Sequence, residues 1–134
     1  MNTQEQKELL IKDLCARLPY EIIIEHEGIL SRLDTIFMCD SISISSTSMD
    51  EKLSYNLDLN EIKPCLYPLS SMTDEQKKEL DDTLVDLNLK ALSDKISSEV
   101  VSTYEIDFYN KNHFDYRGLI PMGLAMDASE LNIY

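Results

Sequence analysis

The residues best suited to chemistry stand close together in residues 113–124. This segment holds one of the two histidines, His113, followed at once by the carboxylate of Asp115. A histidine that titrates near neutral pH can act as a general acid or base with such a carboxylate. In an extended chain, however, residues i and i+2 point to opposite sides, and a helix separates them as well. We therefore predict no local acid–base pair and expect His113 to end a helix and cap its carbonyls.

Arg117 and Gly118 form a second possible recognition element in the same segment. A guanidinium group beside a flexible turn can hold a carboxylate or a phosphate through two hydrogen bonds. In the alternative, Arg117 pairs with Asp115 or with another acid and fixes the turn. We take Arg117, Gly118, His113 and Tyr116 as candidate ligand-binding residues and assign no catalytic residue.

The histidine and cysteine patterns give no indication of a metal or cofactor. His26 stands between Glu25 and Glu27, but on a strand its side chain points away from both. The sequence contains no HExxH or EF-hand pattern, no GxSxG serine and no glycine-rich phosphate loop. Three widely spaced cysteines argue against a disulfide framework, because their number is odd. We expect neither a metal nor another cofactor.

The strongest global feature is acidity, with 25 Asp and Glu against 12 Lys and Arg and a net charge of −13. Six of the acids lie in residues 74–87, on the face of a predicted helix. An acidic surface disfavours nucleic-acid backbones and anionic lipids, since both require cationic groups. Solubility, mimicry of a polyanion and contact with a basic partner remain as alternative explanations.

The sequence also carries expectations about the compartment. No apolar run approaches the roughly 20 residues that span a bilayer, so we expect no membrane association. Residues 1–6 lack the basic and apolar regions of a secretory signal. We therefore expect a cytoplasmic protein, whose oligomeric state the sequence leaves open.

Hydrophobic spacing predicts the elements that position these residues. Residues 4–17 form a helix with a capping-box pattern at residues 3–6, and Pro19 ends it. Residues 20–26, 29–38, 41–45 and 53–59 are predicted as four strands joined by close turns. The core-facing side of the second strand is expected to consist of alternate residues: Ile29, Ser31, Leu33, Thr35 and Phe37.

In the second half of the chain we predict an extended segment followed by two helices. Residues 62–69 cannot be helical, because Pro64 and Pro68 restrict their neighbours. A second capping box at Thr73 begins a helix over 74–87, and a third helix follows over 97–112. We predict a single α+β domain over residues 1–134. It consists of an N-terminal helix, a four-stranded antiparallel sheet or small open barrel, two further helices and a C-terminal segment.

Three blocks of sequence carry a resemblance to other proteins. They are residues 14–20 (LCARLPY), 62–73 (IKPCLYPLSSMT) and 113–120 (HFDYRGLI). Their order and spacing resemble a group of small uncharacterised proteins of gut anaerobic bacteria and their phages or prophages. In that group an arginine commonly stands at the position of Tyr67, so a role of that basic side chain does not transfer to this chain. The resemblance implies an accessory protein of mobile elements.

These observations favour a non-enzymatic binding protein that engages a host protein or a small ligand. One alternative is a protein that sequesters a nucleotide signal of antiphage defence, with Arg117 and the backbone near Gly118 contacting the anion. A second alternative is a small hydrolase or transferase that uses His113 and Asp115. The sequence does not identify the partner.

Overall fold

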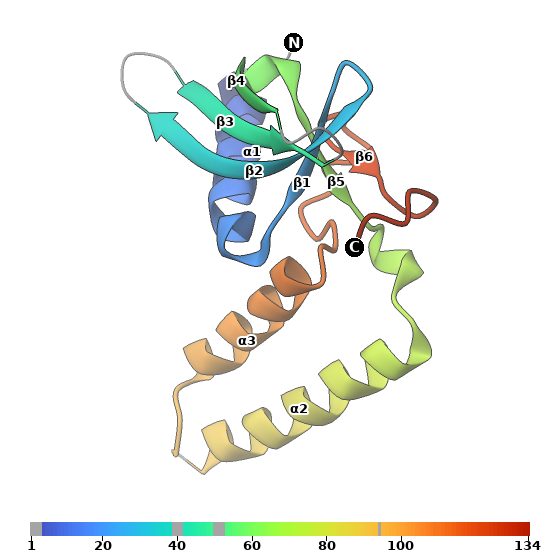
Figure 1. Ribbon diagram of the computed structural model, residues 1–134. Coiled ribbons are helices and arrows are strands. Elements are labelled where there is room, and N and C mark those ends of the chain that lie inside the picture. Colours follow the sequence, from blue (N-terminus) through green and yellow to red (C-terminus); the bar gives the residue numbers. More distant parts are fainter. Residues whose placement is uncertain (1–3, 39–41, 50–52, 94) are drawn as a thin grey trace.

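The computed structural model describes residues 4–38, 42–49, 53–93 and 95–134 (Figure 1). Its helices are α1 (Gln4–Arg17), α2 (Asp74–Leu92) and α3 (Ser98–Lys111). Its strands are β1 (Ile23–His26), β2 (Ile29–Met38), β3 (Ile42–Ser48), β4 (Ser54–Asp58), β5 (Lys63–Leu66) and β6 (Met126–Asp127). The α+β class, with an N-terminal helix and two later helices, is therefore confirmed. The capping pattern expected at residues 3–6 begins at Thr3, which lies outside the described residues.

The strands form one sheet in the order β4-β3-β2-β1-β5-β6. β1 to β4 make the expected antiparallel meander, and β5 pairs antiparallel with β1. β6 pairs in parallel with β5, so that Cys65 stands opposite Met126. The predicted four-stranded antiparallel sheet or small open barrel is therefore wrong, because the sheet is mixed and has six strands.

The two additional strands escaped prediction for different reasons. β5 contains Pro64, which stands opposite Ile24 and has no N–H to donate to a neighbouring strand. That proline led us to treat residues 62–69 as extended chain only. β6 has two residues, too few to show the alternation that predicts a strand.

A shift of register in β2 changes which of its residues face the core. The pairing with β3 is irregular between Leu33 and Thr35. Such a bulge reverses the alternation of the side chains beyond it. Ser31 and Leu33 are buried as predicted, whereas Phe37 is 49% exposed and Ile36 packs against the core instead. The predicted core face is right before the bulge and wrong after it.

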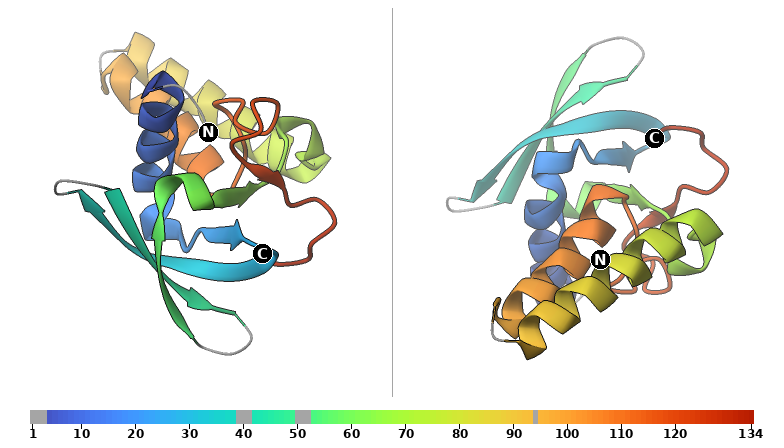
Figure 2. Two further views of the ribbon diagram at one scale, coloured as in Figure 1. Left: turned by 90° about the horizontal axis from the view of Figure 1, so that it is seen from above. Right: turned by 90° about the horizontal axis from the view of Figure 1, so that it is seen from below.

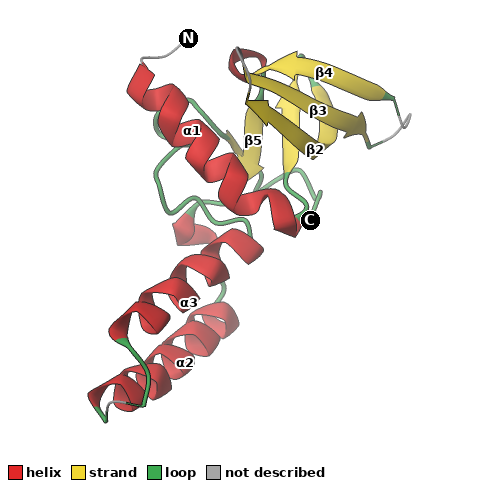
Figure 3. Ribbon diagram, turned by 90° about the vertical axis from the view of Figure 1, so that its left-hand side faces the viewer, coloured by secondary structure: helices red, strands yellow, loops and turns green. Residues whose placement is uncertain are grey.

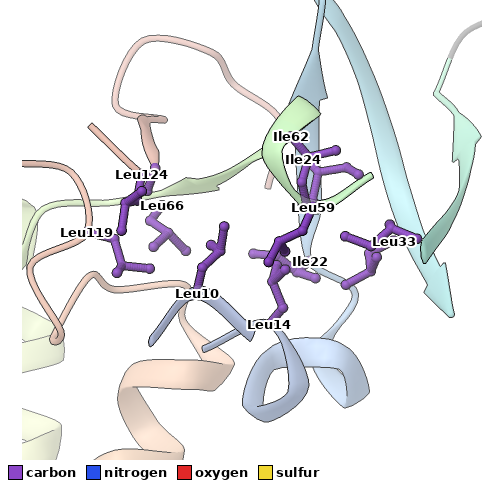
Figure 4. Close-up of a cluster of buried hydrophobic side chains, with 12 residues drawn as sticks. Leu10, Leu14, Ile22, Ile24, Leu33, Leu59, Ile62, Leu66, Leu119 and Leu124 are labelled. Atoms are coloured by element: carbon purple, nitrogen blue, oxygen red, sulfur yellow. The ribbon is translucent and has the colours of Figure 1, made fainter. Parts of the chain in front are cut away.

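α1 lies against one face of the sheet, as Figures 2 and 3 show, and the main core fills the space between them. Leu10 and Leu14, one helical turn apart on α1, are buried in it. Figure 4 shows them among side chains from the sheet region and from the C-terminal segment: Ile22, Ile24, Leu33, Leu59, Ile62, Leu66, Leu119 and Leu124. The C-terminal segment therefore completes the core that α1 begins.

α2 and α3 pack together as a hairpin that extends away from the sheet (Figures 1 and 3). The predicted capping box is present: Gln76 N–H donates to Thr73 Oγ1, and Thr73 N–H donates to Gln76 Oε1. α2 continues past the predicted end at residue 87, and the Ser93 hydroxyl donates to the carbonyls of Leu89 and Lys90. Among the described residues, no helix combines the length and apolarity needed to cross a membrane.

Candidate functional site

α3 ends in a Schellman motif in which His113 takes the left-handed position. His113 has a φ of 62°. Its N–H donates to the carbonyl of Asn110, and the N–H of Phe114 donates to that of Tyr109. Histidine is among the non-glycine residues enriched in this backbone region. His113 thus follows the helix end as expected, but its backbone makes the caps rather than its imidazole.

The imidazole of His113 stacks on the ring of Tyr134, with centroids 3.6 Å apart and an interplanar angle of 12°. The Tyr134 hydroxyl donates to the Cys65 carbonyl and accepts from the N–H of Ile23. Burial, together with the positive charge of Arg17, lowers the pKa of His113 to about 4. At neutral pH the imidazole is therefore uncharged and a weak proton acceptor.

The carboxylate of Asp115 accepts hydrogen bonds from the backbone of the loop that follows it. Oδ1 accepts from the N–H of Leu119 at 2.7 Å, and Oδ2 accepts from the N–H of Ile120 at 2.9 Å. The N–H of Asp115 itself donates to the carbonyl of Tyr67. Both carboxylate oxygens are thus used to shape the loop, and the contacts seen in the described residues do not join Asp115 to His113.

Arg117 reaches α1, where it completes a buried group of charges that we call the Arg–Asp–Arg cluster (Asp13, Arg17 and Arg117). Arg117 Nη1 lies 2.7 Å from Asp13 Oδ1, and Arg17 Nε lies 2.8 Å from Asp13 Oδ2. Arg17 Nη2 also donates to the carbonyl of Phe114. The side chains of Asp13 and Arg17 are fully buried, and that of Arg117 is 14% exposed. The cluster therefore fastens the loop after α3 to α1.

Tyr116 packs beside both arginines of the cluster. Its ring centroid lies 4.5 Å from Cζ of Arg117 and 5.3 Å from Cζ of Arg17. The ring also stacks with Tyr109 at 5.6 Å. Guanidinium groups over an aromatic face gain a cation–π attraction, which grows when water is excluded. Tyr116 thus supports the guanidinium groups in the positions that Asp13 requires.

The sequence contained one signal of this cluster that we missed. Asp13 and Arg17 fall on the same side of α1 as Leu10 and Leu14, at intervals of three and four residues. A charged residue on a core-facing stripe must find a partner, because an unpaired buried charge is costly. That reasoning predicts the pair Asp13–Arg17. It does not predict Arg117, which stands 104 residues from Asp13 in the chain.

The four candidate ligand-binding residues thus lie in one loop. The guanidinium of Arg117 is bonded within the protein, whereas His113 Nδ1 and the Tyr116 hydroxyl are buried and have no hydrogen-bond partner among the described residues. His113 is covered by Tyr134, and Arg117 is bonded to Asp13. Gly118 has a φ of 74°, and a side chain there would meet open space. Its role is a left-handed turn that other residues adopt only with strain. The geometry of this loop accounts for its attachment to α1 and leaves little of it open to a ligand.

A second candidate site lies on the solvent side of α2. Val85, Leu89 and Leu92 are 60%, 61% and 83% exposed, and their spacing places them in line along the helix. Earlier turns of the same side carry three acids and one lysine. We call this surface the α2 outer face and define it by the residues Asp74, Lys78, Asp81, Asp82, Val85, Leu89 and Leu92. It has an acidic first half and an apolar second half.

Comparisons of the chain with protein-family models, with curated proteins and with solved structures give no match. Within the described residues, no three His, Cys, Asp or Glu side chains gather in a way that could hold a metal ion.

Proposed function

We propose that this protein is a non-enzymatic accessory binding protein, of the kind that phages and other mobile elements carry. It engages a host protein through the α2 outer face. The observation that carries the proposal is the exposed line of Val85, Leu89 and Leu92. Single exposed apolar residues are common on protein surfaces, whereas a continuous apolar patch indicates an interaction site. Three such residues at i, i+4 and i+7 are the anchors of a helix that packs against a partner.

The position of α2 leaves this face accessible. The opposite side of α2, with Leu80, Leu84 and Leu87, is buried or half-buried in the hairpin. Figure 3 shows the hairpin standing clear of the sheet. The outer face therefore contributes nothing to the core, and the fold does not explain why it is apolar.

Charge indicates the chemistry of the partner. Asp81 and Asp82 lie one turn before Val85, and the whole chain carries a net charge of −13. Two copies of such a chain repel each other, whereas a cationic partner is attracted and steered to the site. We therefore expect a host protein with an apolar helix face followed by Lys or Arg.

The loop after α3 supports binding rather than catalysis or capture of a nucleotide. His113 has a pKa of about 4, and both oxygens of Asp115 accept backbone hydrogen bonds. The guanidinium of Arg117, which a nucleotide phosphate would require, is bonded to Asp13. Neither alternative has an observation that favours it over the α2 outer face.

Affinity capture from a lysate of a gut anaerobic bacterium tests this proposal. The natural chain is compared with a variant that combines Val85→Ser, Leu89→Ser and Leu92→Ser. The matched control combines Phe37→Ser and Leu53→Ser, because both residues are also exposed, Phe37 on β2 and Leu53 directly before β4. We expect one stoichiometric partner, retained by the control and reduced at least about tenfold by the α2 variant.

The expected attraction between the acidic residues of α2 and a cationic partner can be tested with the same captured protein. Replacing Asp81 and Asp82 by Asn should slow association and weaken its dependence on salt. Undiminished capture by the α2 variant would contradict the proposal, as would an equal loss in the Phe37 and Leu53 control.

A further inference from the structure

A cleft of about 350 Å³ opens where the hairpin joins the rest of the molecule. We call it the root cleft. Four separate segments supply its lining residues: Tyr67; Ser71, Thr73 and Gln76; Asn112 and Phe114; and Ser129. Its volume lies at the small end of the range for ligand pockets. The candidate ligand-binding residues His113, Tyr116, Arg117 and Gly118 are not among its lining residues.

Four of the polar side chains of the root cleft are held in place by hydrogen bonds within the protein. Thr73 and Gln76 hold each other in the capping box. The Ser71 hydroxyl donates to the Pro68 carbonyl, and Asn112 Nδ2 donates to the Phe108 carbonyl. The rotamers are thus set before a ligand arrives, which lowers the entropy lost on binding.

The same bonds leave a mixed set of hydrogen-bonding groups for a ligand. Asn112 keeps its side-chain oxygen as an acceptor, and Gln76 keeps its side-chain NH₂ as a donor. The hydroxyl groups of Tyr67 and Thr73 can each do both, whereas the Ser71 hydroxyl, which donates its proton to Pro68, can only accept. The rings of Tyr67 and Phe114, with centroids 6.5 Å apart, add an apolar wall. Such a lining suits a ring that bears hydroxyl groups and has an apolar face.

Within the described part of the chain, no charged side chain lines the root cleft. None of its seven lining residues is Asp, Glu, Lys or Arg, although these make up 28% of the chain. A phosphate or carboxylate would find no cation there and would meet the negative field of the whole molecule. A cationic ligand would find no carboxylate in the lining.

We propose that the root cleft binds a small uncharged ring compound that bears hydroxyl groups, the chemistry shared by a monosaccharide and a nucleoside. This site is separate from the α2 outer face and does not depend on it. Because the cleft is built from both α2 and the segments that return to the sheet, a bound ligand contacts the junction on both sides.

Two-dimensional NMR of the ¹⁵N-labelled protein tests the proposal with N-acetylglucosamine, adenosine and AMP as probes. We expect at least one neutral probe to shift the side-chain NH₂ signals of Gln76 and Asn112. A response to the sugar alone or to adenosine alone distinguishes the two sources of the ligand. AMP should bind severalfold more weakly than adenosine, because its phosphate meets a negative field without a cation.

Two variants locate the binding. Tyr67→Phe removes one hydroxyl and keeps the ring, so affinity should fall about fivefold. Ser129→Trp places a large side chain in the cleft and should abolish the response. The controls are Tyr55→Phe, on β4, and Ser102→Trp, on the exposed side of α3, and both should bind like the natural chain.

Three results would overturn the proposal. The first is the absence of any shift at Gln76 and Asn112 with either neutral probe up to roughly 10 mM, where binding is too weak to be specific. The second is AMP binding as tightly as adenosine. The third is an undiminished response in Ser129→Trp, provided that its spectrum keeps the dispersion of a folded protein.

Discussion

α1 and α2 are both amphipathic helices, yet the molecule uses them in opposite ways. α1 has 14 residues and buries four of them, including the charged pair Asp13 and Arg17. α2 has 19 residues and fully buries only Leu80, while three large apolar residues face solvent. The first helix is thus required by the fold. The second has an exposed apolar surface that the fold does not use, and the proposed binding function rests on that surface.

The largest expected effect is the loss of stability on neutralising a buried charge of α1, compared with neutralising an exposed charge of α2. Asp13→Asn leaves Arg17 and Arg117 buried beside a neutral side chain, and we expect a loss of about 3 kcal/mol or more in the free energy of unfolding. Asp86→Asn is the matched control, because Asp86 pairs with Lys90 on α2 at 3.1 Å with both side chains about half exposed or more. It should cost less than about 1 kcal/mol.

Urea denaturation of both variants measures these two losses. A loss of similar size in Asp13→Asn and Asp86→Asn would remove the contrast between the two helices. It would mean that the Arg–Asp–Arg cluster contributes no more than an ion pair in solvent.

A fall in pH is expected to have an intermediate effect on the free energy of unfolding. The pKa of His113 is about 4 in the folded state, below its ordinary value of 6.5, so the unfolded state binds more protons between these pH values. Stability from this group is therefore complete above pH 6.5 and is lost as the pH falls toward 4. Because the ring is partly exposed, we expect about 2 kcal/mol rather than the full value of the shift.

The variant His113→Asn isolates this effect, since asparagine also accepts the left-handed conformation but does not titrate. The difference in unfolding free energy between the natural chain and the variant should change with pH from 6.5 to 4. A constant difference over this range would show that protonation of His113 does not act on the folded state.

The smallest expected effect is a loss of stability confined to the α2–α3 hairpin. Thr73→Ala removes the side-chain oxygen that caps α2, and we expect a loss of about 1 kcal/mol. Hydrogen exchange should quicken for amides of α2 and stay unchanged for β1 and β2, because locally stable units open separately. Thr103→Ala on the exposed side of α3 is the control. Equal acceleration in β1 would show that hairpin and sheet unfold as one unit.

Local patterns predicted most of the elements, and long-range contacts account for the rest. Leu10, Leu14 and Pro19 are enough to define α1, and Thr73 with Gln76 defines the start of α2. β6 exists only because it meets β5, some 60 positions earlier in the chain. No local pattern contains that pairing.

In the candidate site, too, local patterns were visible in the sequence and long-range contacts were not. The sequence predicted candidate ligand-binding residues in 113–118, which form the loop that follows α3. It could not show that Arg117 is bonded to Asp13, because the two meet only after the whole chain has folded. The α2 outer face was visible in the sequence as an acidic helix. Leu89 and Leu92 of its apolar half were not placed on that helix, since it was expected to end at residue 87.

The backbone contacts of Tyr67 have a consequence for how this protein can change. Its N–H donates to the His113 carbonyl and its carbonyl accepts from the Asp115 N–H, each at 2.8 Å. The chain thus leaves toward the hairpin and returns from it at the same point. A segment whose two ends lie together can be shortened, lengthened or exchanged with little effect on what holds its ends. The junction at Tyr67 is therefore a boundary at which recombination can replace the hairpin while the sheet stays unchanged.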